Sequence, residues 1–181
     1  MESEYNKFIN LPDLPYNIIA KLIDGNDLFW RLLKYNDPNA YKLDVSHPNL
    51  TKEQKGLLVY DGLKVKTDCR VFMDIGMEES WQEQCSILRV SIFEVIPSNH
   101  VYGSVVIAFE IYTHNSINTL SNYKTRNDML AQQILFALNG ADVSGIGKLY
   151  FDASKNGNSS LKVVGASPYK GKVIKMCNWI V

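Results

Sequence analysis

Clustered carboxylates beside an aromatic ring are the first group in this sequence whose chemistry is worth testing. Glu78, Glu79 and Glu83 lie around Trp81, and such a group can form a cleft of the glycosidase type. The same segment falls between two expected strands, where a polar connection is ordinary and needs no chemical role. We therefore expect no catalytic carboxylate pair here.

The histidines and the one glycine-rich segment also lack the spacing of known sites. The histidines are His47, His100 and His114. None of them belongs to an HxH, HxxxH or HExxH pattern, so we expect no bound metal ion. Residues 140–148 carry three glycines before a lysine, but a phosphate loop needs a strand before its glycines and a helix after them. Here the helix comes first, so we expect a helix stop and no nucleotide cofactor.

The three cysteines are odd in number and widely spaced, at Cys69, Cys85 and Cys177. No CxxC pair occurs, so a disulfide framework is not expected. No nucleophile signature surrounds Cys85 or Cys177, and a buried, free cysteine is the commoner state. We expect a protein made in a reducing, aqueous compartment, and with no catalytic group in view we expect no enzyme.

The composition describes one ordinary globular domain. The chain has 181 residues, of which 46% are hydrophobic and 21% charged, as in proteins that bury a real core. Its 19 basic and 19 acidic residues cancel, which argues against a protein held to nucleic acid by broad phosphate neutralisation. A near-neutral protein also associates easily. The apolar runs are too short to cross a bilayer, and from the polar, acidic start we expect no signal peptide.

Helical periodicity dominates the first third of the chain and returns once later. The expected helices span residues 18–22, 28–33, 51–58 and 122–138. Asn26 or Asp27 suits the N-cap of the second helix, and Thr51 opens a capping box. The last helix has apolar residues spaced by four, with Lys124 and Arg126 on its polar face.

A period of two takes over after residue 62 and predicts strands. The expected strands span residues 69–75, 86–96, 101–113, 148–152, 161–164 and 172–181. Residues 86–96 and 101–113 should form a hairpin whose strands exceed the usual length. Strands of that length either lie centrally in a sheet or project towards a partner. The fold class that we expect is α+β: a small antiparallel or mixed sheet with a long hairpin, packed against two or three helices.

The start of the chain differs from the rest because it carries two prolines among apolar residues. Pro12 and Pro15 favour extended backbone, so residues 1–17 are expected to form an N-terminal arm and residues 18–181 a single α+β domain. The arm either folds back on its own domain or reaches a neighbouring subunit. The expected interface residues are Phe8, Ile9, Leu11, Leu14, Phe93, Val95, His100, Tyr102 and Tyr112.

Several stretches, taken in order, resemble a known group of phage proteins. They read LIDGNDLFWRLLKY at 22–35, RVFMDI at 70–75, ALNGAD at 137–142 and GIGKLYF at 145–151. This pattern resembles the small head-to-tail connector, neck-ring and tail-completion proteins of tailed bacteriophages. It is also similar to the tail terminators, which place helices against a small sheet and close into rings. The resemblance covers residues 18–152 and leaves out the arm and the last strand.

The resemblance implies a structural virion protein without an active site or cofactor. Such a subunit would assemble in the host cytoplasm into an oligomeric ring, contact other neck, portal or tail proteins, and let DNA pass without reading its sequence. It would not contact a membrane. Rings need an interface between two different faces of the subunit, and strand addition by hairpins and arms provides one.

Two other classes of function stay open. The first is a small hydrolase or ligand-binding domain whose pocket is built from distant residues, with Glu78, Glu83 and His114 as its leading candidates. The second is a binding module for a regulatory protein of the host or phage, which predicts a monomer with one apolar surface patch.

Overall fold

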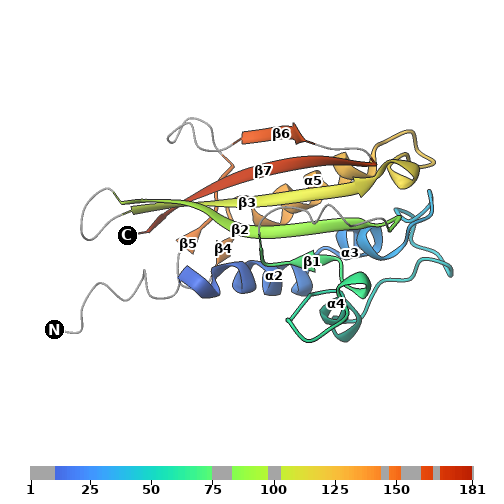
Figure 1. Ribbon diagram of the computed structural model, residues 1–181, viewed down its shortest axis with the longest axis horizontal. Helices are drawn as coiled ribbons and strands as arrows, with labels where there is room; N and C mark the ends of the chain where they lie inside the picture. Colours follow the sequence, from blue (N-terminus) through green and yellow to red (C-terminus); the bar gives the residue numbers. More distant parts are fainter. Residues whose placement is uncertain are drawn as a thin grey trace.

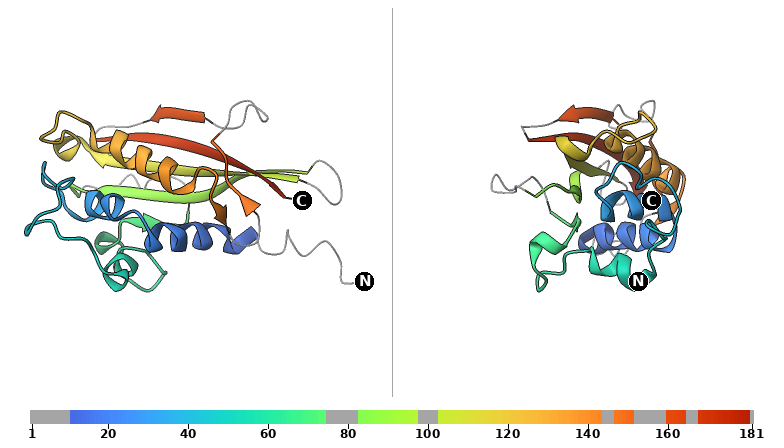
Figure 2. Two further views of the ribbon diagram at one scale, coloured as in Figure 1. Left: turned by 180° about the vertical axis from the view of Figure 1, so that it is seen from behind. Right: turned by 90° about the vertical axis from the view of Figure 1, so that its right-hand side faces the viewer.

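A five-stranded mixed sheet forms one layer of the protein, and helices cover one of its faces (Figures 1 and 2). The computed structural model describes residues 11–74, 83–97, 103–143, 147–151, 160–164 and 168–180. The strand order is β1-β2-β3-β7-β6. Strand β1 runs parallel to β2, and all other neighbours are antiparallel. The expected α+β fold with its mixed sheet is therefore confirmed.

The long hairpin is the centre of this sheet. The five strands are β1 (Val71–Phe72), β2 (Ser86–Pro97), β3 (Gly103–His114), β6 (Ser160–Val164) and β7 (Tyr169–Ile180). A separate two-stranded sheet pairs β4 (Asp142–Val143) with β5 (Gly147–Lys148). The first strand is shorter than expected, because Cys69 ends a 3₁₀ turn and residues 73–74 form a bend.

Local capping explains where the helices begin. The helices are α2 (Leu14–Asp24), α3 (Asp27–Lys34), α4 (Lys52–Leu57) and α5 (Arg126–Leu138), with 3₁₀ turns η1 (Leu11–Asp13), η2 (Lys66–Asp68) and η3 (Asn115–Ile117). Asn26 caps α3 by accepting from Phe29 N–H, and Thr51 and Gln54 form the expected capping box. Thr125 caps α5, so this helix begins later than the apolar pattern suggested.

The second half of the expected N-terminal arm is helical, which corrects the expectation of an extended segment over residues 11–17. Pro15 lies in the first turn of α2, where proline costs no helical hydrogen bond. Leu14, expected at an intersubunit surface, is instead buried in the core, and Leu11 packs against that core. Residues 1–10, including Phe8 and Ile9, lie outside the described residues.

The main core lies between the helices and the inner face of the sheet. Trp30 is fully buried there, and its indole N–H donates to Leu22 O at 2.7 Å. Ile107 and Phe109 of β3 face Ile134 of α5 in the same cluster. A smaller cluster lies on the outer face and consists of Cys69, Phe72, Cys85, Ile87 and Tyr169. All three cysteines are buried, as expected, and none of them takes part in a disulfide. None of the described helices is both long and apolar enough to cross a membrane.

Candidate functional site

Three strands continue past the helical layer at one end of the molecule (Figure 1). We call this part the sheet extension and define it as residues 93–97, 103–105 and 177–180. Its strands end in one row, because Pro97 pairs with Gly103 and Gly103 pairs with Ile180. Alternating apolar residues give these strands their length, and the helices that bury the rest of the sheet stop short of this end (Figure 2).

A β-bulge turns one aromatic side chain outward at the base of the extension. The register between β2 and β3 shifts between Ile92 and Glu94, which leaves Phe93 as the extra residue. Phe93 is 54% exposed, and the ammonium of Lys175 lies 3.1 Å from the centre of its ring. Val95, on the opposite face, is 37% exposed. Two of the expected interface residues are thus exposed apolar groups of the extension.

The backbone along the outer edge of β2 is open in the described part of the chain. Leu88 N–H donates to Arg70 O, so it points away from β3. Because Leu88 pairs with Ile111 and Val95 with Val105, strand alternation makes the N–H of Val95 point outward too. On this outer edge, no described strand or bridge pairs with β2 beyond Arg89.

The opposite edge of the extension is open in the same sense. Strand β6 covers the outer edge of β7 only between Gly171 and Lys175. Tyr150 then exchanges two backbone hydrogen bonds with Cys177, at 2.8 and 3.0 Å. Beyond Cys177, no described residue pairs with this outer edge of β7. An unpaired strand edge is a template for another chain.

A charged row crosses the outer face of the sheet beside the extension. Arg89 is nearly buried, forms an ion pair with Asp74 and lies 5.0 Å from the ring of Phe72. Glu110 is opposite Arg89 in the register and accepts a hydrogen bond from the Tyr112 hydroxyl at 3.2 Å. Burial, followed by the charge of Glu110, raises the pKa of Tyr112 to about 12. Tyr112 was expected at an interface. In the structure its side chain is half-buried, and its hydroxyl group donates to a residue of the same strand.

Comparison with known proteins places this arrangement in a family. The family model YomW matches residues 26–176, from the cap of α3 into β7. The chain belongs to the YomW family. YomW is a phage-derived family, so this is a phage-related protein. Comparison with curated proteins and with solved structures finds no significant match.

Two of the residues considered for a hydrolytic pocket share one corner of this YomW protein. The Tyr169 hydroxyl donates to Glu83 O, and the ring of His114 packs edge-on against Tyr169 at 5.3 Å. Each side chain has a structural contact, because His114 Nδ1 lies 2.6 Å from Ser116 Oγ and the Glu83 carboxylate lies 3.9 Å from Arg70. Burial raises the pKa of Tyr169. Glu78, His100 and Tyr102 lie outside the described residues.

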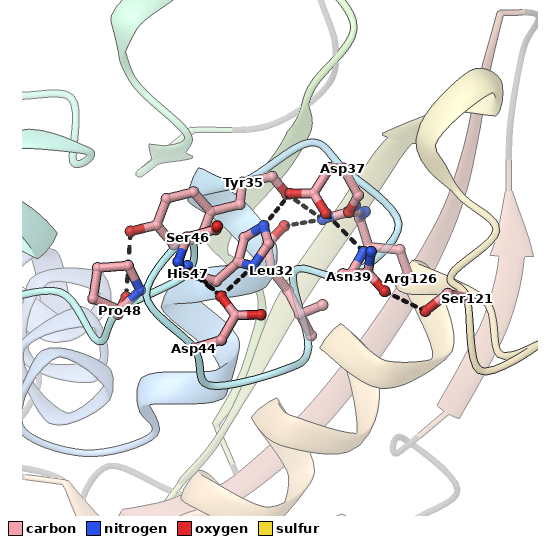
Figure 3. Close-up of polar contacts among 10 residues, drawn as sticks. All are labelled: Leu32, Tyr35, Asp37, Asn39, Asp44, Ser46, His47, Pro48, Ser121 and Arg126. Carbon is pink, nitrogen blue, oxygen red and sulfur yellow. Dashed lines mark hydrogen bonds and ion pairs between the residues drawn. The ribbon is translucent and has the colours of Figure 1, made fainter.

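At the other end of the molecule, the side chain of a buried arginine binds backbone carbonyl groups of a loop (Figure 3). The guanidinium of Arg126 donates to four carbonyl oxygens, those of Leu32, Tyr35, Asp37 and Ile117, at 2.6 to 3.0 Å. Burial lowers the pKa of Arg126 to about 10, and the nearby Asp37 opposes this shift. The sequence pattern had assigned Arg126 to a solvated helix face, and the structure corrects this.

The same loop closes around a histidine (Figure 3). His47 Nδ1 lies 2.9 Å from the carboxylate of Asp44, and Nε2 contacts Asp37. With both ring nitrogens engaged by carboxylates, His47 joins the two ends of the loop. Desolvation is the largest single effect on the Asp44 carboxyl and would raise its pKa. Hydrogen bonds from the backbone and side chain of His47 and from the backbone of Ser46 together outweigh it, so the pKa of Asp44 is lowered. Within the described ranges, no group of three His, Cys, Asp or Glu residues is arranged to hold a metal.

Proposed function

We propose that this YomW-family protein is a structural subunit of the phage particle that forms a ring at the joint between head and tail. The observation that carries the proposal is the sheet extension, which has an open edge on both sides among the described residues. A subunit with two open edges can pair with a neighbour on each side. A ring is the closed form of that arrangement.

The direction of the strands supports a head-to-tail contact between copies. Strands β2 and β7 both run antiparallel to β3, so they run parallel to each other. If β7 of one subunit pairs with β2 of the next, the sheet continues across the joint and every subunit keeps the same orientation. This contact joins two different edges, which is the heterologous kind that rings require.

The exposed side chains of the extension suit a buried joint. Phe93 and Val95 flank the open edge of β2, and their apolar surface would leave water when a neighbouring strand is added. The charge balance of the chain is compatible with a channel for DNA, because 19 basic and 19 acidic residues leave no net attraction to phosphate. DNA would then slide through without being held.

The test removes one outward N–H from the edge of β2 without removing a bond to β3. Val95→Pro takes away the donor that a neighbouring strand needs, and proline is tolerated on strand edges. Val95→Thr is the matched control, because threonine keeps both the N–H and the branched shape. Light scattering and negative-stain imaging should find rings for the native chain and for Val95→Thr, and monomers for Val95→Pro. A native chain that stays monomeric at every concentration, and does not bind portal or tail proteins, would refute the proposal.

A further inference from the structure

The loop that joins α3 to α4, residues 35–51, contains neither helix nor strand but is held by buried cationic side chains. Arg31 donates to Tyr41 O at 3.0 Å, and Arg126 donates to Asp37 O at 2.8 Å. Loops of this length without regular structure are uncommon in compact domains and often serve a function. Arginine is charged throughout the neutral range, including Arg126 with its pKa of about 10, so these two anchors do not depend on pH there.

The third anchor of this loop is the ring of His47, which lies between two carboxylates (Figure 3). The side chain is 10% exposed, Nδ1 lies 2.9 Å from the Asp44 carboxylate, and Nε2 contacts the Asp37 carboxylate. An ionised carboxylate only accepts hydrogen bonds, so each ring nitrogen must carry a hydrogen to make its contact. A ring with hydrogens on both nitrogens is the positively charged form. The closed loop therefore contains a charged His47.

Loss of one proton from the ring would break one of these two contacts, because a bare nitrogen and a carboxylate both present lone pairs. The Asp44 carboxylate is anchored locally, since its Oδ1 also accepts the N–H groups of Ser46 and His47 at 2.9 and 2.8 Å. Oδ2 of Asp37 has no other donor among the described residues, and its Oδ1 accepts the N–H of Asn39 at 2.8 Å. We therefore expect the neutral ring to keep Asp44 and to lose Asp37.

The charged and titratable groups that face this ring come from the loop, from the end of α3 and from α5. Asp37 and Asp44 belong to the loop. Tyr35 caps α3 and packs edge-on against the ring at 5.2 Å, and Arg126 of α5 approaches through its bond to Asp37 O. Aspartate, tyrosine and arginine ordinarily change charge outside the range of about pH 5 to 8, whereas histidine changes charge within it. His47 is therefore the group of this cluster that responds near neutral pH.

We propose that His47 is a proton-controlled clasp of this loop. While the ring is charged, the loop is closed on Asp37, and after the loss of one proton residues 38–46 separate from it. The clasp adds stability at lower pH and loses it as the pH rises through the range in which the ring is deprotonated. Its acid limit is set by the carboxylates, and because the pKa of Asp44 is lowered, this carboxylate stays ionised below the usual range of aspartate.

The clasp controls two exposed apolar side chains at the tip of the loop. Leu43 is 65% exposed and Val45 is fully exposed. The closed loop fixes the direction in which these side chains are presented, and proton loss would convert a fixed apolar tip into a mobile one. The inference does not depend on the proposed ring, because every group that it uses belongs to one subunit.

Hydrogen–deuterium exchange of the full-length chain, followed by mass spectrometry from about pH 5 to about pH 8, tests the clasp. Exchange of the imidazole C2 hydrogen reports the protonation of each histidine, with His114 as the internal reference. Amide exchange, corrected for its intrinsic pH dependence, reports the closure of residues 38–46. Their protection should fall by at least about tenfold while His47 loses its proton, as expected for one charge-assisted hydrogen bond, and the protection of α5 should stay constant. A His47 ring that stays in one state, or loop protection that does not change, would overturn the proposal.

Two variants distinguish the clasp from a purely structural role of this histidine. Asp37→Asn keeps the shape of the side chain. Its carbonyl oxygen can accept the N–H of Asn39, which turns its amino group towards Nε2, and that group can donate only to the neutral ring. Protection of residues 38–46 should then no longer fall as the pH rises. His114→Gln, outside the loop, is the control and should keep the native profile. A fall in Asp37→Asn as large as in the native chain, or its loss in His114→Gln, would contradict the proposal.

Discussion

The two ends of this sheet differ in where their backbone polar groups find partners. At the end where α5 begins, Arg126 is fully buried, and its described hydrogen-bond partners are backbone carbonyls of the same chain. At the other end, the extension exposes Phe93 and Val95 beside open strand edges in the described structure. Polar groups bonded inside the subunit give no reason for a partner, whereas open edges and exposed apolar groups do. The stabilising polar contacts therefore lie at one end, and the other end is the one that we propose for association.

The largest expected effect is at Arg126. Arg126→Met removes the guanidinium donors from all four carbonyl oxygens, of which Asp37 O alone keeps another described donor, the N–H of Ala40. The free energy of unfolding should fall by about 3–5 kcal/mol, because each orphaned carbonyl costs more than a lost hydrogen bond alone. Urea unfolding followed by circular dichroism measures it. Lys124→Met, at an exposed position just before α5, is the control and should change the stability little; equal losses would remove the distinction between the ends.

A smaller effect at the same end should follow from adding one methyl group. A Cβ on Gly171 of β7 would lie 2.8 Å from Ile111 O and 2.9 Å from Tyr112 Cδ1. Because the first of these is backbone, Gly171→Ala should reduce the free energy of unfolding by about 1–3 kcal/mol. Gly56→Ala is the matched control, since nothing lies within 4 Å of the added atom in α4. There, alanine should be neutral or stabilise by up to about 1 kcal/mol. Thermal unfolding of the pair would contradict the packing argument if both variants behaved alike.

Sequence reasoning succeeded where the deciding interactions are local. The hairpin of β2 and β3 follows from alternation along two adjacent stretches, and the caps at Asn26 and Thr51 follow from hydrogen bonds within three residues. The start of α2 was missed because Pro15 was interpreted as favouring an extended arm. Its position in the first helical turn removes that objection, and the buried face of α2 stabilises the helix.

The features that distinguish the two ends depend on contacts between distant residues. Arg126 binds Leu32 and Asp37, which are 94 and 89 residues away in the chain, so the helical pattern around it could only suggest a solvated face. The open edge of β2 likewise depends on which strands become neighbours. Strand β7 pairs with β3 over the whole length of β3, whereas β1 pairs with β2 only at Leu88 and Arg89. No local sequence pattern determines which strands become these neighbours.

The smallest expected effect on stability is at Phe93, where the comparison predicts the largest effect on association. Phe93→Ser removes a half-exposed ring and its contact with Lys175, so the free energy of unfolding should change by no more than about 1 kcal/mol. Association should weaken by at least about tenfold, because aromatic side chains at the centre of an interface contribute most of its affinity. Phe136→Ser is the control, since Phe136 is also exposed but belongs to α5 and not to the extension. Sedimentation velocity over a concentration series distinguishes the cases. If the two serine variants associate equally well, the exposed ring at the bulge has no part in assembly, and the open strand edges alone must hold the subunits together.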